Sequence, residues 1–428
     1  MASTGKIAEV LFEQTLETYE HQMQMLDLVD IFKPNEADMQ NAGDVMWRPV
    51  QQHAPVIEGW DLTGQETDII EETYPAFLGN PQNDFIEQRA DDLRDMRFWE
   101  RRGQQSGRRQ ATELNKRIAA LIANTGSLFY RSDVVSGYDF IAEAQALMNE
   151  RQIPSEDMRY FMLNDRDQLK FAKDLAGRQT LQGRPESTWN TGQIGQNVAE
   201  FDVYTGSFLP NIVGGTAVAT TTTADVSDKP EGGAVDNNTN TVTNVDYRIS
   251  SDIAVTDSST YTVGDVIKFD NGGTDVQSVG LADKNPSGQA MTFRVVGVDV
   301  GGANTLRVFP KPIAADDGLL TDLEKAYANI DTKILSGANV TPLNTDPSAK
   351  ANIFWCDNSV EVTGGDAPIE LLNEFGGMKV ISSTMKNGQK MYMAYDGDIA
   401  KLTFRCRLFT WYGLTNKNPS ANGVALTF

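Results

Sequence analysis

Cysteine and histidine are almost missing from this sequence, whose 428 residues include two of each. Cys356 and Cys406 lie in apolar, strand-like segments with no second thiol or histidine at metal-binding spacing. We therefore expect both to be buried and to behave as small hydrophobic residues. With only His21 and His53 available, metal chemistry and histidine acid–base catalysis have little support. The composition argues against an enzyme, a metal site and a cofactor.

Long apolar runs and positive charge are also scarce. No segment approaches the roughly eighteen apolar residues that span a bilayer, and the first residues lack a signal-peptide core. We expect assembly in a cytoplasm and no membrane partner. Lys and Arg number 37 against 59 Asp and Glu, which gives a formal net charge of −22. Such a surface opposes unspecific binding of nucleic acid by the chain as a whole, so self-association must rest on local contacts.

The order of patterns along the chain indicates a mixed α+β protein of several domains. At 428 residues it is too long for one core, and two or three domains are expected. Residues 216–312 are rich in Thr, Val, Asp, Asn and Gly, and they lack helical periodicity. We interpret this stretch as a β-barrel or β-sandwich inserted into an α+β body.

The strongest helical signal lies at residues 105–122. Steps of three and four place these apolar residues on one face of a helix: Ala111, Leu114, Ile118, Leu121 and Ile122. A helix is also predicted over residues 85–99, where Asp91 and Asp92 are poor candidates for paired catalytic carboxylates because adjacent helical residues point about 100° apart. Residues 89–117 hold nine basic residues against five acidic ones. These cations either pair with carboxylates of neighbouring parts or face a polyanion.

Residues 6–24 are predicted to form an amphipathic helix with Ser3 as its N-cap. Glu9, Glu13 and Glu17 repeat every four residues, which costs an isolated helix a few tenths of a kcal/mol per pair. These side chains form either a solvated acidic face or a docking face for a basic partner helix. The pattern alone leaves both interpretations open.

Residues 45–78 hold three strand-like segments, 45–50, 57–62 and 68–78, interrupted by prolines. Because proline is tolerated in edge strands and loops, we predict a long hairpin that projects from the body. Its aromatic residues, among them Trp47 and Trp60, either pack on the base of the hairpin or dock on another subunit.

Shorter elements fill the remainder of the chain. Helices are predicted at 138–150, where Ser136 and Asp139 resemble a capping box, at 168–175 and at 320–335. Strands are predicted at 127–131, 160–163, 241–247, 249–256, 265–270, 291–298, 306–310, 353–355, 360–362, 378–382, 390–395 and 402–411. The last strand alternates, with Arg405 and Arg407 on the face opposite Cys406. Residues 236–246 loosely resemble a calcium loop without its glycine and terminal glutamate, so we interpret them as a flexible loop.

Short motifs across nearly the whole chain resemble the major coat protein of P22-type short-tailed phages (podoviruses). They are, in order, WRPV (47–50), EGWDLT (58–63), GNP (79–81), NDF (83–85), RADDLRD (89–95), PKP (310–312), AYAN (326–329), NIFW (352–355), GDI (397–399) and WYG (411–413). Each motif is short, but their combined order is specific.

The resemblance implies the HK97-like capsid fold that tailed phages share with herpesviruses. Its parts are expected here as an N-terminal arm (1–35), an extended loop or hairpin with part of the peripheral domain (36–82), a linking helix, spine helix and peripheral strand (83–136), a first part of the axial domain (137–215), an inserted all-β barrel or Ig-like domain (216–340), and second parts of the axial and peripheral domains (341–428).

By the same resemblance, the chain is a major capsid protein without enzymatic activity. Pentamers and hexamers of itself are expected to form an icosahedral procapsid and then the mature virion shell around double-stranded DNA. The implied partners are a scaffolding protein, a portal protein and DNA bound without sequence specificity. Assembly is expected in the cytoplasm of the bacterial host.

The resemblance also suggests roles for single residues. Glu13 and Glu17 match acidic positions of the family's arm that face the basic end of the scaffolding protein. Residues 232–248 align with a loop whose charged residues pair across two-fold axes; Asp236 matches, but Asn238 and Thr241 stand where the family has charge, so hydrogen bonds are the alternative there. The candidates for contacts between subunits are Trp47, Trp60, Asp61, Arg89, Asp91, Asp92, Arg94, Asp95, Asp236, Asp246 and Arg248.

Two alternatives remain from the residues themselves: another structural component of a virion, or a β-rich protein that binds a ligand in its inserted domain. Electron microscopy of the chain co-expressed with its scaffolding protein separates these classes. A coat protein gives closed shells, whereas a binding module remains monomeric.

Overall fold

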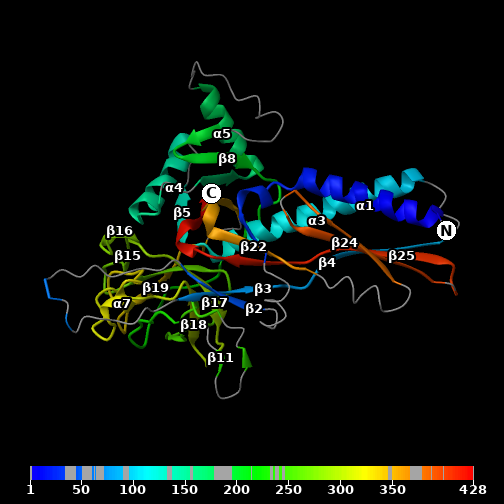
Figure 1. Cartoon of the computed structure of the whole chain (residues 1–428). Helices are drawn as coiled ribbons and strands as arrows, with labels where there is room; N and C mark the ends of the chain where they lie inside the picture. The colour runs from blue at the N-terminus through cyan, green and yellow to red at the C-terminus, as the bar shows by residue number, and fades with distance from the viewer. Residues whose placement is uncertain are drawn as a thin grey trace. The chain divides into compact units, whose positions relative to one another are not determined.

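The computed structural model describes residues 2–33, 45–50, 60–61, 63, 72–89, 96–132, 137–154, 158–177, 195–213, 215–231, 235–236, 241–242, 246–345, 349–366, 378–386, 388–398 and 400–427. Figure 1 shows the elements of the chain, which divides into two compact units. Unit 1 comprises Met1–Met46, Ala76–Ala119 and Glu361–Thr415, and unit 2 comprises Trp47–Pro75, Ala120–Val360 and Asn416–Phe428. None of the helices in the described ranges has the length and apolar character needed to cross a membrane.

Unit 1 is built on a four-stranded antiparallel sheet in the order β23-β24-β25-β4. Its strands are β4 (Gln82–Arg89), β23 (Lys379–Thr384), β24 (Lys390–Asp398) and β25 (Thr403–Thr410). The predicted alternation of β25 is confirmed: Phe404, Cys406 and Leu408 are buried, and Arg407 is exposed.

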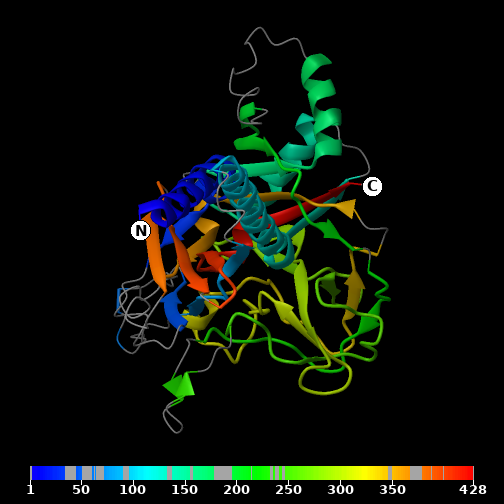
Figure 2. The same ribbon diagram turned by 90° about the vertical axis from the view of Figure 1, so that its right-hand side faces the viewer.

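Two helices, α1 (Ala2–Gln22) and α3 (Met96–Thr125), lie side by side (Figures 1 and 2). The boundary between the units falls within α3, after Ala119. In unit 1, α3 covers one face of the sheet: the ring of Trp99 meets that of Phe404 edge-on, with 5.8 Å between centroids. The apolar stripe predicted for this helix is confirmed, because Ala111, Leu114 and Ile118 are fully buried.

A smaller sheet, β1-β22-β26, completes unit 1. It is formed by β1 (Asp30–Phe32), β22 (Val360–Gly364) and β26 (Tyr412–Asn416), and a 3-10 turn, η1 (Leu26–Leu28), precedes it. Two further strands, β2 (Val45–Pro49) and β3 (Thr73–Phe77), pair with each other. Most of the predicted strands 57–62 and 68–78 lies outside the described residues.

Unit 2 contains a six-stranded mixed sheet in the order β5-β27-β21-β6-β8-β7. Its strands are β5 (Leu128–Ser132), β6 (Arg159–Leu163), β7 (Gly195–Val198), β8 (Phe201–Thr205), β21 (Asn352–Cys356) and β27 (Asn422–Thr427). Helix α4 (Tyr138–Glu150) packs on it, since Phe140 and Ile141 join one hydrophobic cluster with Phe161 and Phe354. The short elements around it are α5 (Asp165–Gly177), β9 (Asn211–Ile212), β20 (Ala349–Lys350), η3 (Asp357–Ser359) and η4 (Pro419–Ala421).

A second six-stranded sheet, β10-β19-β14-β17-β18-β13, has a hydrophobic cluster of its own that runs from Ala217 to Val340. Its strands are β10 (Thr220–Thr221), β13 (Ile253–Ala254), β14 (Val266–Asp270), β17 (Phe293–Val298), β18 (Thr305–Phe309) and β19 (Asn339–Pro342). The accompanying elements are the hairpins β11 (Val235–Asp236) with β12 (Thr241–Val242) and β15 (Gln277–Val279) with β16 (Pro286–Ala290), and α7 (Asp322–Lys325). The limits 216–340 of an inserted domain stay a prediction.

The helix predicted over residues 85–99 is wrong in its first part. Residues up to Arg89 form β4, in which every backbone position from Gln82 onward is paired with β25. The exposed side chains of Asn83, Phe85 and Glu87 alternate with the interior ones. Tertiary pairing therefore overrides the weak helical preference of the segment.

Five other local predictions also need correction. The first helix begins at Ala2, so Ser3 is inside it, and α4 has Gly137 as its N-cap with no side-chain hydrogen bond in place of the predicted capping box. The helix predicted at 320–335 is limited to α7, because Ile330 bridges to Ser278 and Ala314 in β structure. Of the predicted strand 241–247, β12 covers Thr241–Val242, residues 243–245 lie outside the described residues, and residues 246–247 are not in a strand. Strand β13 is confined to two residues of the predicted strand 249–256. Both cysteines are buried and unbridged, as predicted.

Candidate assembly surfaces

Helix α1 presents one face to α3 at very short range. Two glycines of α3 make this possible, since a Cβ built on Gly103 would lie 2.8 Å from the carbonyl oxygen of Leu11. A Cβ on Gly107 would lie 2.5 Å from the carbonyl oxygen of Thr15. Close backbone approach of this kind requires glycine. The face of α1 that contacts α3 is therefore fixed, and Tyr19 and Glu20 contact Gln389 and Lys386 of unit 1. The exposed face of α1 stays available to other molecules.

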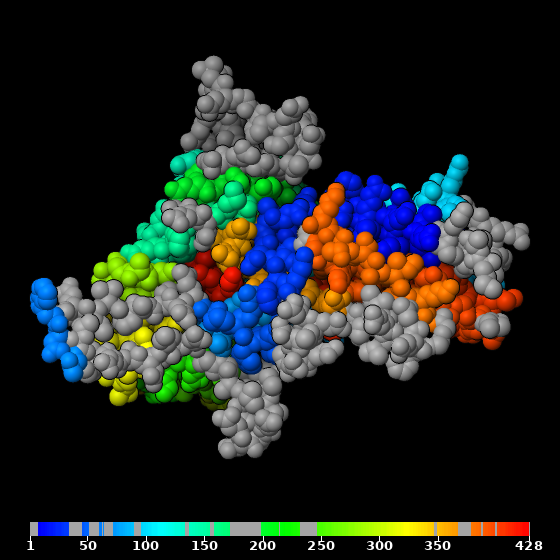
Figure 3. Space-filling view, viewed as in Figure 1, coloured from blue at the N-terminus to red at the C-terminus, as the bar shows by residue number. Residues whose placement is uncertain are grey.

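An acidic stripe lies on the exposed side of α1, which forms part of the surface in Figure 3. Glu9, Glu13 and Glu17 are all exposed. The Oε2 atom of Glu17 accepts a hydrogen bond from Gln14 at 3.4 Å. Within the described ranges, Glu9 and Glu13 form no ion pair. Glu13 and Glu17, which the family resemblance assigns to a basic partner, are thus both exposed.

The basic excess along α3 is only partly neutralised within the chain. Arg102 pairs with Asp84 at 2.9 Å, and Arg117 pairs with Glu113 at 3.4 Å. Other cations of α3 are exposed and have no ion pair to the part of the chain that the structure describes: Arg101, Arg108, Arg109 and Lys116. Pairing within the chain therefore accounts for some of these residues, and a basic surface remains.

The face of the sheet opposite α3 is charged and carries one exposed aromatic ring. Arg405 lies between two carboxylates, with its Nε 3.3 Å from Glu87 and its Nη2 2.9 Å from Asp398. Phe85 is 60% exposed, and it stands opposite Arg407 in the register of β4 with β25. The apolar ring of Phe85 is therefore exposed to solvent on the same face as the ion pairs of Arg405.

The side chain of Trp60 is completely exposed, at 107% of its reference area. Next to it, Oδ1 of Asp61 accepts hydrogen bonds from the backbone N–H of Thr63 at 3.0 Å and from its hydroxyl at 2.6 Å. These hydrogen bonds hold the pKa of the Asp61 carboxyl below its usual range. The pair presents a large ring and a stable negative charge from the same turn.

The other predicted contact residues are spread over both units. Trp47 is half-buried against Tyr247, with 5.5 Å between ring centroids, and Arg89 is exposed at the end of β4. Asp236 belongs to β11. The candidates in the RADDLRD motif after Arg89 lie outside the described residues: Asp91, Asp92, Arg94 and Asp95.

Arg248 is used inside the chain. It is only 5% exposed, and it donates from Nε and Nη2 to the carboxylate of Asp246 at 3.0 and 2.8 Å. Its Nη1 donates to the backbone carbonyl of Asn416, and its guanidinium carbon lies 5.4 and 5.3 Å from the ring centroids of Tyr74 and Phe309. Because these contacts occupy both members of the pair, we leave Asp246 and Arg248 out of the proposed intersubunit contacts.

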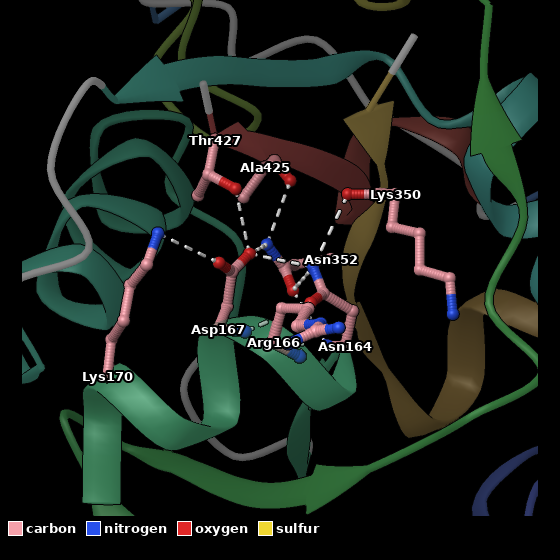
Figure 4. A network of polar contacts seen from close by, with 8 residues as sticks. All are labelled: Asn164, Arg166, Asp167, Lys170, Lys350, Asn352, Ala425 and Thr427. Atoms are coloured by element: carbon pink, nitrogen blue, oxygen red, sulfur yellow. Dashed lines mark hydrogen bonds and ion pairs between the residues drawn. The ribbon is translucent and has the colours of Figure 1, made fainter. Parts of the chain in front are cut away.

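A second buried network ties the last strand of the chain to α5 (Figure 4). Asp167, only 2% exposed, accepts hydrogen bonds from Asn164 at 2.7 Å, Asn352 at 2.9 Å and Thr427 at 2.8 Å. The Oδ1 atom of Asn164 accepts from the backbone N–H groups of Arg166 and Asp167, which satisfies the first turn of the helix. Sequence reasoning missed this network, although Asn164 before a helix was a readable capping signal.

Comparisons with known proteins found one family model and several solved structures of similar fold. A family model described as P22 coat protein, gene protein 5, matches residues 1–427. The chain is similar in structure to the capsid of cyanophage P-SCSP1u, with a TM-score of 0.45, 11% identity, and 95% of this chain and 88% of that chain covered. It is also similar to a Mycobacterium phage Che8 structure, with a TM-score of 0.42, 10% identity, and coverage of 94% and 90%. A virus-like particle from Pyrococcus furiosus follows at 0.40 and 8% identity, with coverage of 97% and 98%. Because these scores lie below 0.5, the family assignment rests on the family model.

Proposed function

This chain belongs to the P22 coat protein family and is a phage major capsid protein, and we propose that its exposed surfaces meet different partners during assembly of the shell. The observation that supports this most is the complete exposure of Trp60. A tryptophan buries roughly 150–250 Å² when it is covered, and such rings dominate the energy of interfaces. We assign Trp60 and Asp61 to the contact with a neighbouring subunit.

The acidic stripe of α1 is assigned to the scaffolding protein. Glu13 and Glu17 are exposed, and neither forms an ion pair with the described residues. They offer negative charge to a basic helix of a partner. Exposed pairs contribute about 0–1 kcal/mol each, and this weakness suits a partner that joins the procapsid and later leaves.

The exposed cations of α3 are assigned to packaged DNA. Arg101, Arg108 and Lys116 form a basic surface on a chain of strongly negative net charge, and backbone phosphates are read by such cations without sequence specificity. Other expectations that belong to the same proposal are a portal protein at one vertex, assembly in the bacterial cytoplasm and the absence of enzymatic activity.

Charge reversal on α1 tests the scaffolding assignment. The variant Glu13→Lys/Glu17→Lys, co-expressed with the scaffolding protein, is expected to give procapsids with less scaffolding protein per coat subunit, measured by quantitative gel densitometry at low salt. The matched control Glu100→Lys/Glu231→Lys makes the same change of charge at two exposed positions outside α1. Equal scaffold content in both variants and the parent protein would remove the assignment.

A further inference from the structure

Unit 2 contains a partly open cavity of about 530 Å³ whose lining is rich in basic side chains. The side chains around it include five cations and a single carboxylate, that of Glu72. The cations are Arg151, Arg248, Lys284, Lys311 and Lys417. This balance is the reverse of that of the whole chain, which has 59 acidic and 37 basic residues.

Two of these cations have a carboxylate nearby. Arg248 is neutralised by Asp246, as described above. The Nζ atom of Lys311 forms an ion pair with Oε1 of Glu72 at 3.3 Å and has no further hydrogen-bond partner in the described part of the chain. Lys311 is only 4% exposed, so its ammonium group brings unused hydrogen-bond donors to the cavity.

Arg151 donates only to neutral groups, and Lys284 donates to a neutral carbonyl, with the exposed carboxylate of Asp283 as the nearby negative charge. The guanidinium of Arg151, a 7% exposed residue, donates to the hydroxyl of Ser127 at 2.7 Å and to its carbonyl at 3.4 Å. The ammonium of Lys284 donates to the carbonyl of Ala328 at 3.2 Å. Burial lowers the pKa of Arg151 to about 10 and that of Lys284 to about 8. For the buried Arg151, whose hydrogen bonds within the described residues all go to neutral groups, burial of the charge is costly, and a bound anion would offset that cost.

The backbone holds these cations in place. The carbonyl of Arg151 accepts a hydrogen bond from the N–H of Leu281 at 3.0 Å. The Oε1 atom of Gln152 accepts hydrogen bonds from the backbone N–H groups of Ala282 and Asp283. Across the cavity, Nδ2 of Asn329 donates to the carbonyl of Lys311 at 2.7 Å. The site is therefore formed in the absence of a ligand, as small-molecule sites usually are.

We propose that this cavity is a binding site for a small free oxyanion of the phosphate class, held by Arg151, Lys284 and Lys311. Phosphate suits the site because lysine ammonium and arginine guanidinium groups bind its oxygens through charge-assisted hydrogen bonds. The cavity volume lies within the roughly 300–1,000 Å³ of small-molecule sites. This inference is independent of the contacts proposed for scaffolding protein and DNA.

Calorimetric titration of inorganic phosphate into the purified full-length chain tests the site, with chloride used to keep the ionic strength constant. The parent protein is expected to bind phosphate, and Lys284→Met and Lys311→Met are each expected to bind on the order of tenfold more weakly, because each loses a charge-assisted hydrogen bond. Lys284→Arg keeps the charge and should retain most of the affinity. The control Lys333→Met removes a half-buried cation that pairs with Asp225 outside the cavity and should bind like the parent.

The dependence on pH gives a readout that misfolding cannot imitate. Because the folded pKa of Lys284 is about 8, its ammonium group is lost as the pH rises through that value. Phosphate affinity of the parent should fall between pH 7.5 and 9, and this fall should be smaller in Lys284→Met. Equal heats for phosphate and chloride, unchanged affinity in both methionine variants, or binding of a single-stranded oligonucleotide without binding of free phosphate would overturn the proposal.

Discussion

Gly107 of α3 lies so close to Thr15 of α1 that a Cβ built on it would be 2.5 Å from the carbonyl oxygen of Thr15. A Cβ atom does not come that close to an oxygen in real structures. The two helices can therefore approach this closely only because residue 107 has no side chain. The position of the N-terminal helix on unit 1 depends on it.

Gly107→Ala is expected to lower the free energy of unfolding by about 1–3 kcal/mol, the usual cost of overpacking. In an exposed helix the same change would stabilise by roughly 0.5–1 kcal/mol, so the sign of the effect is informative. Urea unfolding of the monomer measures it. Gln105→Ala, at an exposed position of the same helix, serves as the control and should change little. A variant at Gly107 that is as stable as the parent would show that α1 is not docked this closely.

Arg248→Ala should destabilise unit 2 strongly. The substitution leaves the carboxylate of Asp246 without its bidentate partner and removes the guanidinium between Tyr74 and Phe309. Breaking a buried pair of this kind costs about 3–5 kcal/mol. Thermal unfolding followed by circular dichroism measures the effect.

The matched control is Arg307→Ala, which breaks the half-exposed pair with Asp252 and should cost about 0–1 kcal/mol. Similar losses for the two variants would contradict the internal role given to Arg248. If assembly failed while the monomer kept its stability, Arg248 would belong to an interface after all.

Asp167→Asn should loosen the end of the chain. The carboxylate accepts three hydrogen bonds, from the side chains of Asn164, Asn352 and Thr427. In the variant, the NH2 group of the new amide would point toward one or more of these donors and could not accept from them. A loss of about 1–3 kcal/mol is expected, because a buried polar group is left unsatisfied. Hydrogen exchange should show faster exchange in β27, and Asp165→Asn, at an exposed position of the same helix turn, should leave exchange there unchanged.

The long, periodic elements could be predicted from the sequence because burial repeats along them. The stripe from Ala111 to Ile122 and the alternation of Phe404, Cys406 and Leu408 both follow directly from such repeats. Short elements are less accessible: the sequence predicts a helix from residue 85, within β4, because the pairing of β4 with β25 joins residues more than 300 positions apart. A local pattern contains no signal for such a partner. The capping box of Thr321 and Glu324 matched a readable motif, yet the helix after it ends within one turn.

In the candidate surfaces too, local features could be predicted from the sequence and features that depend on distant residues could not. Exposure of Glu13 and Glu17 followed from helical spacing, whereas the internal role of Arg248 depends on residues as distant as Tyr74 and Asn416. The basic cavity was not predicted because its lining comes from segments that are separate in sequence. Only the folded chain brings Arg151, Lys284 and Lys311 to one site.

A cryo-electron microscopy reconstruction of the assembled shell tests the central claim that this chain is completed by copies of itself. Trp60, fully exposed in the single chain, should be covered by a neighbouring subunit at every quasi-equivalent position of the lattice. A shell in which Trp60 remains open to solvent, or folds back on its own subunit, would contradict the claim.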